Sequence, residues 1–419
     1  MSESIAFRRI VDDFIDELSE SSMEALVESV RSQTPTDGEI AYLAKVCANT
    51  EEVIWPKSDR AADVASTGGP TSLTTLICPL YLRAFGYDVP KLGVPGRPAG
   101  GIDVLAQIPG YKFVLTDSEV ATAIRNAGYA HFLAGKNHGK RDAILFEYRK
   151  KANAVNVVPL VIASLLAKKL EVGLSRVGLD VRVAPFANFG RTFNEARANA
   201  KKFCSVAQIL DIQAVCFLTN GSVPYQPYIG RGESLVALSD LLSDTGSPEL
   251  NRHLDLCYAI ASGTAGFEAI RPTTAQLRLH FSNNLDAQGA SIDRFFEKAQ
   301  LIKNMHQFEL TAPDHGFLII DILRLRGVLI RHQKNLASEA DPFADPVGVI
   351  VRASHQTYLS KGDLIATVRT PTALWPIVQA ELAEALRISI YDPRNNTDNP
   401  HDVDFTSVTS SPERVVHDE

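Results

Sequence analysis

Strand-like and helix-like segments alternate along the chain between Asp63 and about Leu242. Gly178 to Val183 and Ala214 to Asn220 are short runs rich in apolar and β-branched residues, the composition of a buried strand. Apolar residues at helical spacing fall between such runs, as from Leu73 to Phe85 and from Thr116 to Ala127. This alternation is typical of proteins in which helices cover a largely parallel sheet. The sequence therefore predicts the α/β fold class.

The chain is longer than an ordinary single domain, so we expect two or three lobes. Its 419 residues are 45% hydrophobic, which is enough for a large core. From Phe308 the pattern changes to short strands and turns, interrupted by a helix from Leu374 to Ala385, which predicts a β-rich lobe. The last residues, Arg394 to Glu419, are polar, and we expect a mobile tail there.

Charge and cysteine content argue against several kinds of binding partner and indicate the cellular compartment. The formal net charge is −7, with lysine and arginine scattered along the chain, which argues against binding to nucleic acid or to an anionic membrane. No apolar run approaches the roughly 20 residues of a membrane span. The five cysteines lack CxxC or zinc spacing, so we expect buried free thiols and no metal site. These observations predict a cytoplasmic protein.

A glycine-rich stretch from Asp63 to Leu73 is the first candidate site. A β-biased entry is followed by hydroxyl residues, two adjacent glycines and a helical run. Glycines let a ligand approach the backbone without a Cβ in the way, and the start of a helix presents free N–H groups to an anion. We interpret it as a phosphate loop, and the alternative is an ordinary capped turn between strand and helix. The residues expected to bind the anion are Ser66, Thr67, Gly68, Gly69 and Ser72.

A second glycine-rich loop, from Gly93 to Gly101, follows one helix and one strand later. It runs into Ile102 to Leu105 and then into Ile108 to Gly110. Two such loops separated by one βα passage indicate a single site lined from both. Either loop alone would be better explained as a surface turn.

The third candidate lies on the apolar helix predicted from Val157 to Leu170. Ser164 and Lys168 are four residues apart, so they share one face of that helix. A lysine on a helix face is usually solvated. Spacing alone therefore leaves a solvated lysine as the better explanation.

Several blocks of the chain, from about Phe14 to about Ile390, resemble the thymidine and pyrimidine-nucleoside phosphorylase family. Ser66 to Gly69 stands where the family has Lys-His-Ser-Thr-Gly-Gly, and Gly100 to Gly110 is similar to its glycine-rich loop with Leu-Asp-x-Leu and Ile-Pro-Gly. Pro159 to Leu170 is similar to the block with Ile-Ala-Ser-x-x-x-x-Lys-Lys-Leu. Further similar blocks are Leu179 to Val183, Thr219 to Arg231 and Asp341 to Gly348.

In that family an Arg, a Ser and a Lys at fixed spacing hold the pyrimidine ring, and Arg149, Ser164 and Lys168 keep this spacing. Cleavage of a pyrimidine N-glycosidic bond leaves negative charge on the base, mostly on its carbonyl oxygens. Arg149 and Lys168 can donate to those oxygens as charge develops, and Ser164 can fix the N3 side of the ring. The resemblance therefore implies that Arg149 and Lys168 are catalytic and that all three bind the base.

The phosphate half of the site departs from the family pattern. Positions in the family's phosphate loops and at its monovalent-cation site hold other residues here: Val64, Ala65, Pro70, Ala99 and Leu238. Lys150 stands where the family has an Asp after its base-binding Arg. Loss of a lysine and a threonine removes a charge and a hydrogen bond, each about 1 kcal/mol or more in a desolvated site. Lys91 and Arg97 are candidate replacement cations, and the alternative is that both are surface residues. His131 and His138 have no spacing support as replacements for the family histidine, so we expect structural or surface histidines.

Lys91 occupies a position similar to a lysine of anthranilate phosphoribosyltransferases, which are fold relatives of the phosphorylases. The expected reaction is reversible phosphorolysis of a pyrimidine nucleoside to free base and pentose 1-phosphate. Inorganic phosphate is the expected co-substrate in an altered pocket, and no other cofactor is expected. Alternatives are glycosyl transfer or hydrolysis with a nucleotide or phosphoribosyl co-substrate, and a non-catalytic pyrimidine-binding paralogue.

The resemblance also implies an architecture and a homodimer. The dimer contact would involve the helical domain, where Met23, Leu26, Val27 and Val30 form either a dimer face or an intrachain core. The implied parts are a helical domain (1–60 with 141–175), an α/β domain (61–140 with 176–305), a C-terminal α+β lobe (306–393) and the tail (394–419).

Overall fold

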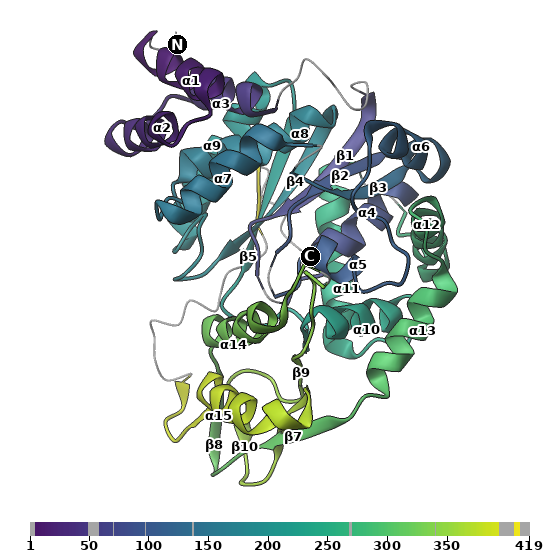
Figure 1. Cartoon of the computed structure of the whole chain (residues 1–419). Helices are drawn as coiled ribbons and strands as arrows, with labels where there is room; N and C mark the ends of the chain where they lie inside the picture. The colour runs from purple at the N-terminus through teal and green to yellow at the C-terminus, as the bar shows by residue number, and fades with distance from the viewer. Residues whose placement is uncertain are drawn as a thin grey trace.

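The computed structural model of the chain describes residues 5–48, 58–69, 71–96, 98–135, 138–267, 270–339, 341–393 and 406–410 (Figure 1). Strands alternate with helices through the middle of the chain, and the predicted α/β class is confirmed. A group of N-terminal helices lies at one end of the molecule and a lobe of short strands at the other (Figure 1). Among the described helices, none has the length and apolar character needed to cross a membrane.

The central sheet has three parallel strands and one antiparallel edge strand, in the order β1-β4-β5-β13. These strands are β1 (Ser58–Ser66), β4 (Leu174–Val183), β5 (Gln213–Asn220) and β13 (Thr406–Val408). In this register Ser66 lies beside Asp180, and Arg182 lies beside Thr219. Because parallel strands end at the same edge, polar residues from three strand ends meet there.

Helices cover both faces of this sheet (Figure 1). On one face lie α8 (Val158–Glu171) and α9 (Phe193–Ile209), and on the other α4 (Thr74–Ala84) and α11 (Pro248–Ala265). Val177, Leu179 and Val181 of β4 are buried in the core that includes α8 and α9. Between them, Asp180 points to the opposite face, where Thr74 of α4 donates to it. One face of β4 is therefore apolar and the other carries polar groups at its end.

Three N-terminal helices pack together with two helices from the middle of the chain. The N-terminal helices are α1 (Ile5–Glu17), α2 (Glu20–Ser32) and α3 (Asp37–Ala48), and their partners are α7 (Lys140–Lys151) and α8. The apolar stripe of α2 is buried within the chain: Met23 is 8% exposed and Leu26 is 0% exposed. Of the two explanations for this stripe, the structure shows the intrachain core.

A two-stranded parallel sheet lies beside the central sheet. It consists of β2 (Val89–Gly93) and β3 (Tyr129–Leu133). The helices of this region are α5 (Gly101–Leu105), α6 (Asp117–Ala127), α10 (Arg231–Leu241), α12 (Thr274–Ala287) and α13 (Ile292–Lys303). α6 begins at a capping box of Thr116 and Glu119 and ends at Gly128, whose φ of 65° favours glycine.

The C-terminal lobe combines two antiparallel sheets with helices. Its sheets have the strand orders β6-β9-β11-β7 and β10-β8-β12. The elements are β6 (Tyr228–Ile229), β7 (Gln307–Thr311), β8 (Gly316–Ile320), α14 (Ile322–Leu336), β9 (Gly348–Val351), β10 (Tyr358–Leu359), β11 (Leu364–Arg369), η1 (Thr372–Leu374), α15 (Trp375–Ala385) and β12 (Leu386–Ser389). The prediction of strands and turns is wrong for α14, in which Ile322, Leu325, Val328 and Leu329 are buried at helical spacing.

The predicted mobile tail contains a strand. Thr406 to Val408 pair antiparallel with Cys216 to Leu218 of β5, and Val408 is 6% exposed. For these three residues the prediction is wrong, because the edge of β5 supplies backbone partners that the tail sequence does not reveal. Residues 394–405 and 411–419 lie outside the described residues.

Candidate functional site

The predicted base-binding residues Ser164 and Lys168 contact each other on α8. The Lys168 amino group donates to the hydroxyl and to the carbonyl oxygen of Ser164, both at 3.0 Å. It also forms an ion pair with the carboxylate of Asp142, in the first turn of α7. Lys168 is 9% exposed and Asp142 is 3% exposed, so the pair is largely desolvated. Lys168 is therefore a buried and oriented cation rather than a solvated one.

Arg149, near the end of α7, has its guanidinium on backbone carbonyl groups. Nε donates to the carbonyl oxygen of Ala154 at 3.3 Å, Nη1 to that of Leu160 at 3.2 Å and Nη2 to that of Val155 at 3.1 Å. Burial lowers the pKa of Arg149, and the Asp142 carboxylate opposes this effect. Arg149 therefore joins the α7–α8 connection to the first turn of α8, the helix that carries the other two candidates.

Glu171, in the last turn of α8, adds a titratable group to this cluster. Its Oε1 accepts from the N–H of Gly139 at 2.6 Å, and the residue is 7% exposed. Burial raises the pKa of Glu171 to about 7; the Gly139 hydrogen bond opposes the rise and the Asp142 charge adds to it. The carboxyl group therefore titrates at a higher pH than an ordinary glutamate, near neutral pH.

Glu171→Gln is expected to stabilise the protein more at about pH 8 than at about pH 4.5. The pKa of Glu171 is raised from 4.5 to about 7 in the folded state. The folded state therefore binds more protons than the unfolded state in this window, and stability falls as pH rises through it. Glutamine does not titrate. The gain in the free energy of unfolding of the variant over the wild type should therefore be larger at the higher pH than at the lower pH, by about 3 kcal/mol at most.

Urea unfolding of both proteins at the two pH values measures this difference. Glu147→Gln is the matched control, because Glu147 has a 67% exposed side chain and pairs only with Lys150 among the described residues. We expect no pH-dependent gain from the control. A Glu171→Gln effect of equal size at both pH values would contradict the prediction.

Asp63 of β1 is buried between two lysines. Its Oδ1 accepts from Nζ of Lys91 at 2.6 Å, and its Oδ2 accepts from Nζ of Lys169 at 2.5 Å. Burial raises the pKa of Asp63, but the two lysines outweigh it and hold that pKa below its ordinary value. Lys91 also donates to the carbonyl oxygen of Val64 at 2.6 Å and is 4% exposed. The amino group of this candidate anion-binding residue is thus committed to Asp63 and Val64.

The predicted phosphate loop lies at the carboxyl end of β1. The N–H of Gly68 donates to Oγ of Ser66 at 3.2 Å, which turns the chain away from the strand. Gly68 and Gly69 have φ values of 99° and 145°, which other residues rarely adopt. Both glycines are exposed, so the loop presents its backbone to solvent.

Hydroxyl groups at both ends of the loop are engaged by the surrounding structure. Oγ1 of Thr67 accepts from the backbone N–H of Arg182 at 3.0 Å. Oγ of Ser72 accepts from the N–H of Thr74 at 3.1 Å, at the start of α4. Arg97, the second candidate cation, lies outside the described residues.

The carboxylate of Asp180 on β4 accepts hydrogen bonds from several polar groups around this loop. It accepts from the hydroxyls of Ser66 at 3.3 Å, Thr74 at 3.2 Å and Thr219 at 2.8 Å. It also accepts from Nε and Nη2 of Arg182, at 3.2 and 3.1 Å. The sequence predicted this segment as a strand and as a block similar to the phosphorylase family, without a site role for Asp180 or Arg182. The alternation of strand side chains places Asp180 and Arg182 on one face, but their position beside Ser66 depends on the β1–β4 register.

Tyr225 and His253 extend the same cluster. The Tyr225 hydroxyl donates to Oγ1 of Thr219 at 2.7 Å, and its ring stacks on His253 with centroids 5.6 Å apart. Nε2 of His253 accepts from the N–H of Leu73 at 2.8 Å. Burial lowers the pKa of His253 to about 3, and the Arg182 charge adds to the shift. His253 is therefore neutral near pH 7, with its proton on Nδ1.

His131 and His138 are buried and engaged, as expected of structural histidines. Nδ1 of His131 pairs with the Tyr129 hydroxyl at 3.2 Å, and burial lowers the pKa of His131 well below its ordinary value. Nε2 of His138 pairs with the carbonyl oxygen of Leu115 at 2.9 Å. All five cysteines are buried free thiols, as predicted. Within the described ranges, no three His, Cys, Asp or Glu side chains are grouped to hold a metal ion.

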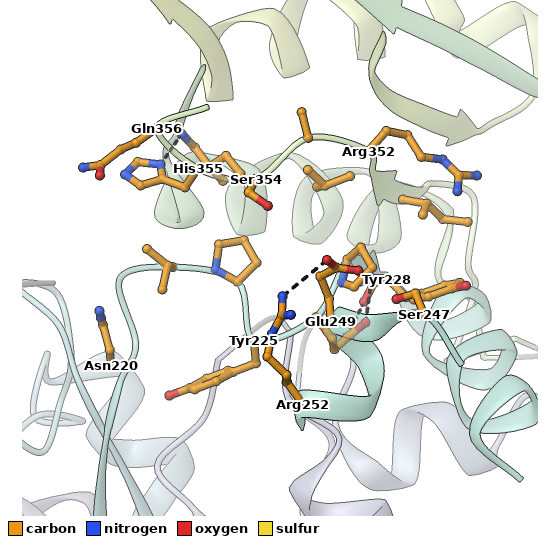
Figure 2. A pocket seen from close by; sticks show the side chains of 18 residues that line it. Asn220, Tyr225, Tyr228, Ser247, Glu249, Arg252, Arg352, Ser354, His355 and Gln356 are labelled. Carbon is orange, nitrogen blue, oxygen red and sulfur yellow. Dashed lines mark hydrogen bonds and ion pairs between the residues drawn. The ribbon is translucent and has the colours of Figure 1, made fainter. Parts of the chain in front are cut away.

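A cavity of about 530 Å³ lies between the central sheet and the C-terminal lobe (Figure 2). Asn220 and Tyr225 line it from one side, and Arg352 and His355 line it from the other (Figure 2). Because Tyr225 also contacts Thr219, the cavity borders the Asp180 cluster. Its volume is within the range of small-molecule sites, roughly 300–1,000 Å³.

No protein-family model matches the chain, but many curated proteins are similar to much of it. The chain is 23% identical to the pyrimidine-nucleoside phosphorylase of Geobacillus stearothermophilus over 346 residues, which cover 78% of each protein. It is 26% identical to human thymidine phosphorylase, over 65% of this chain and 56% of that protein. The AMP phosphorylase of Methanospirillum hungatei is 27% identical over 86% of this chain and 70% of its own length.

Two solved structures of anthranilate phosphoribosyltransferase are also similar. The enzyme from Thermus thermophilus has a TM-score of 0.49 and 14% identity, covering 71% of this chain and 94% of that one. The enzyme from Saccharomyces cerevisiae has a TM-score of 0.49 and 12% identity, covering 71% of this chain and 92% of that one.

Proposed function

We infer that this chain, a divergent relative of the thymidine and pyrimidine-nucleoside phosphorylases, is a pentosyltransferase acting on the bond between a pyrimidine base and a pentose. Similarity to the Geobacillus phosphorylase extends over 78% of the chain. The observation that carries the inference is the buried arrangement of Ser164, Lys168 and Asp142 on α7 and α8. It presents one oriented cation and one hydroxyl on a single helix face.

In the proposed reaction the pyrimidine binds against α8, with its polar edge toward Ser164 and Lys168. As the glycosidic bond breaks, negative charge develops on the base oxygens, and its attraction to the Lys168 ammonium strengthens. Asp142 orients the ammonium through their ion pair. Arg149 contributes to base binding by exchanging one of its three backbone carbonyl partners for an oxygen of the base.

The proposed co-substrate is inorganic phosphate, and no further cofactor is proposed. Its site is the glycine loop, comprising Ser66, Thr67, Gly68, Gly69 and Ser72. The pocket differs from the family pattern because Val64 and Ala65 supply neither charge nor hydrogen bonds from their side chains. Lys91 supports this pocket indirectly, because it holds the carboxylate of Asp63, which lies three residues before the loop. Arg97 is a candidate for direct contact with the phosphate.

A nucleoside 5′-phosphate is a second candidate substrate. Similarity to the AMP phosphorylase of Methanospirillum hungatei over 86% of this chain favours this possibility, because that protein is named for a nucleotide. A 5′-phosphate would place a second anion near the pentose. The two substrate classes are therefore separable by comparing nucleosides with their monophosphates.

The proposed assembly is a homodimer, and the proposed compartment is the cytoplasm. Buried free thiols support a reducing compartment. Since the apolar stripe of α2 is used within the chain, the proposed dimer contact involves other residues of the helical region.

The proposal predicts phosphate-dependent release of free base from a pyrimidine nucleoside. Purified protein is incubated with uridine, thymidine and their 5′-monophosphates, with and without inorganic phosphate, and products are separated by chromatography. Free base together with pentose 1-phosphate, formed only when phosphate is present, is the expected result. Base release without phosphate would overturn phosphorolysis in favour of hydrolysis. No release from any substrate, with free pyrimidine still binding, would leave a binding role only.

A further inference from the structure

One guanidinium nitrogen beneath the glycine loop is buried without a partner. Nε and Nη2 of Arg182 donate to Asp180, whereas Nη1 has no hydrogen-bond partner among the described residues. The Arg182 side chain is 5% exposed. A buried donor without an acceptor keeps the full desolvation penalty of its group, which is larger when the group is charged. Such an atom therefore calls for an acceptor that binds there.

The unpartnered nitrogen lies against the glycine loop. A Cβ built on Gly69 would fall 2.0 Å from Nη1, so Nη1 occupies the space of a side chain at this position. Gly69 is exposed, so Nη1 lies directly under a solvent-facing part of the loop that lacks a side chain. The backbone N–H of Arg182 holds the same loop through Oγ1 of Thr67, at 3.0 Å.

We propose that Arg182 is the cation that binds the oxyanion in the glycine loop, with Nη1 donating to a phosphate oxygen. This inference rests on the proposed function and names a residue that supplies a buried hydrogen-bond donor to the loop, where the side chains of Val64 and Ala65 supply none. The ligand class is a phosphate group, either inorganic phosphate or the phosphate of an ester.

Other buried cations near β1 are already engaged. Lys91 and Lys169 share the carboxylate of Asp63, and Lys91 has a second partner in the carbonyl oxygen of Val64. Arg182 differs from both because its pair with Asp180 uses two of its nitrogens and leaves the third unused. Arg182 is therefore the cation of this group in which one whole nitrogen is left without a hydrogen-bond partner among the described residues.

The surroundings of Arg182 hold its guanidinium in one orientation. Asp180 is itself fixed by hydroxyl donors from Ser66, Thr74 and Thr219. The Tyr225 ring lies against the guanidinium, 5.1 Å from its carbon to the ring centroid. A guanidinium held in this way loses little conformational entropy when an anion binds.

The test measures binding of inorganic phosphate, ribose 5-phosphate and free uracil by isothermal titration calorimetry. Arg182→Gln is expected to weaken the affinity for phosphate or for the ester about tenfold or more and to leave the affinity for uracil unchanged. Arg176→Gln is the matched control, because Arg176 is half-buried earlier on the same strand and we expect no change in any affinity. Circular dichroism confirms that each variant is folded.

A second pair of variants keeps the arginine. Gly69→Ala places a methyl group against Nη1 and should weaken anion binding. Gly135→Ala is its control: Gly135 also has a positive φ, 154°, but no atom lies within 4 Å of the added Cβ, so anion binding should not change. Anion affinity that survives both Arg182→Gln and Gly69→Ala would overturn the inference and leave the proposed function standing. Absence of anion binding by the wild-type protein, together with no phosphate-dependent turnover, would overturn both.

Discussion

Lys168→Gln is expected to lower kcat for base release by about 100-fold or more. Glutamine retains a hydrogen-bond donor on a side chain one bond shorter than that of lysine, but it carries no charge. The lost interaction is the one that strengthens as negative charge forms on the leaving base, so kcat should fall more than KM rises. Steady-state kinetics on the best nucleoside of the panel separates the two parameters.

Lys150→Gln is the control for this experiment. Lys150 is a lysine on α7 with a 49% exposed side chain that pairs with Glu147, so its replacement should leave both parameters unchanged. Unfolding curves establish that the Lys168 variant is folded at the assay temperature. A folded Lys168→Gln protein with normal kcat would remove Lys168 from the proposed mechanism.

Asp63→Asn is expected to cause the largest loss of stability, about 3–5 kcal/mol. The carboxylate is 0% exposed and is the shared partner of Lys91 and Lys169. An amide cannot neutralise either lysine, so two ammonium groups would remain buried close to each other without a counter-ion. The free energy of unfolding in urea measures the loss.

Asp88→Asn provides a comparison of the same chemistry at the surface. Asp88 has a 32% exposed side chain and pairs with Arg83 at 2.9 Å, so we expect a loss of about 1 kcal/mol or less. If the two variants lost similar stability, Asp63 would not be the central ion of a buried cluster. Their comparison thus separates the effect of burial from the loss of one negative charge.

Local periodicity explains which parts of the fold could be predicted. Strand β5 was expected because it contains a continuous apolar run, which in a parallel sheet reflects burial on both faces. Strand β4 was expected because apolar residues alternate with polar ones along it. α14 was missed because it begins almost directly after the apolar strand Gly316–Ile320, and its own first residues are also apolar. A short apolar run does not distinguish a helix from a strand. Sequence pattern therefore located buried segments more reliably than it distinguished their type.

The same reasoning applies to the candidate site. Ser164 and Lys168 were placed together because contacts four residues apart on a helix follow from sequence alone. Asp142 reaches Lys168 from another helix, and Lys91 reaches Asp63 from another strand. Such pairs depend on tertiary packing, so the sequence identified the cations without their counter-ions.

Strand β13 makes the central sheet depend on a segment made late in synthesis. β5 is translated long before Thr406–Val408, the residues that cover its outer edge. Until they emerge from the ribosome, the nascent chain carries a strand edge able to pair with another copy. If the chain ended before Thr406, the outer edge of β5 would lack this partner strand permanently. We therefore expect a chain shortened before Thr406 to be less soluble during expression than the full chain.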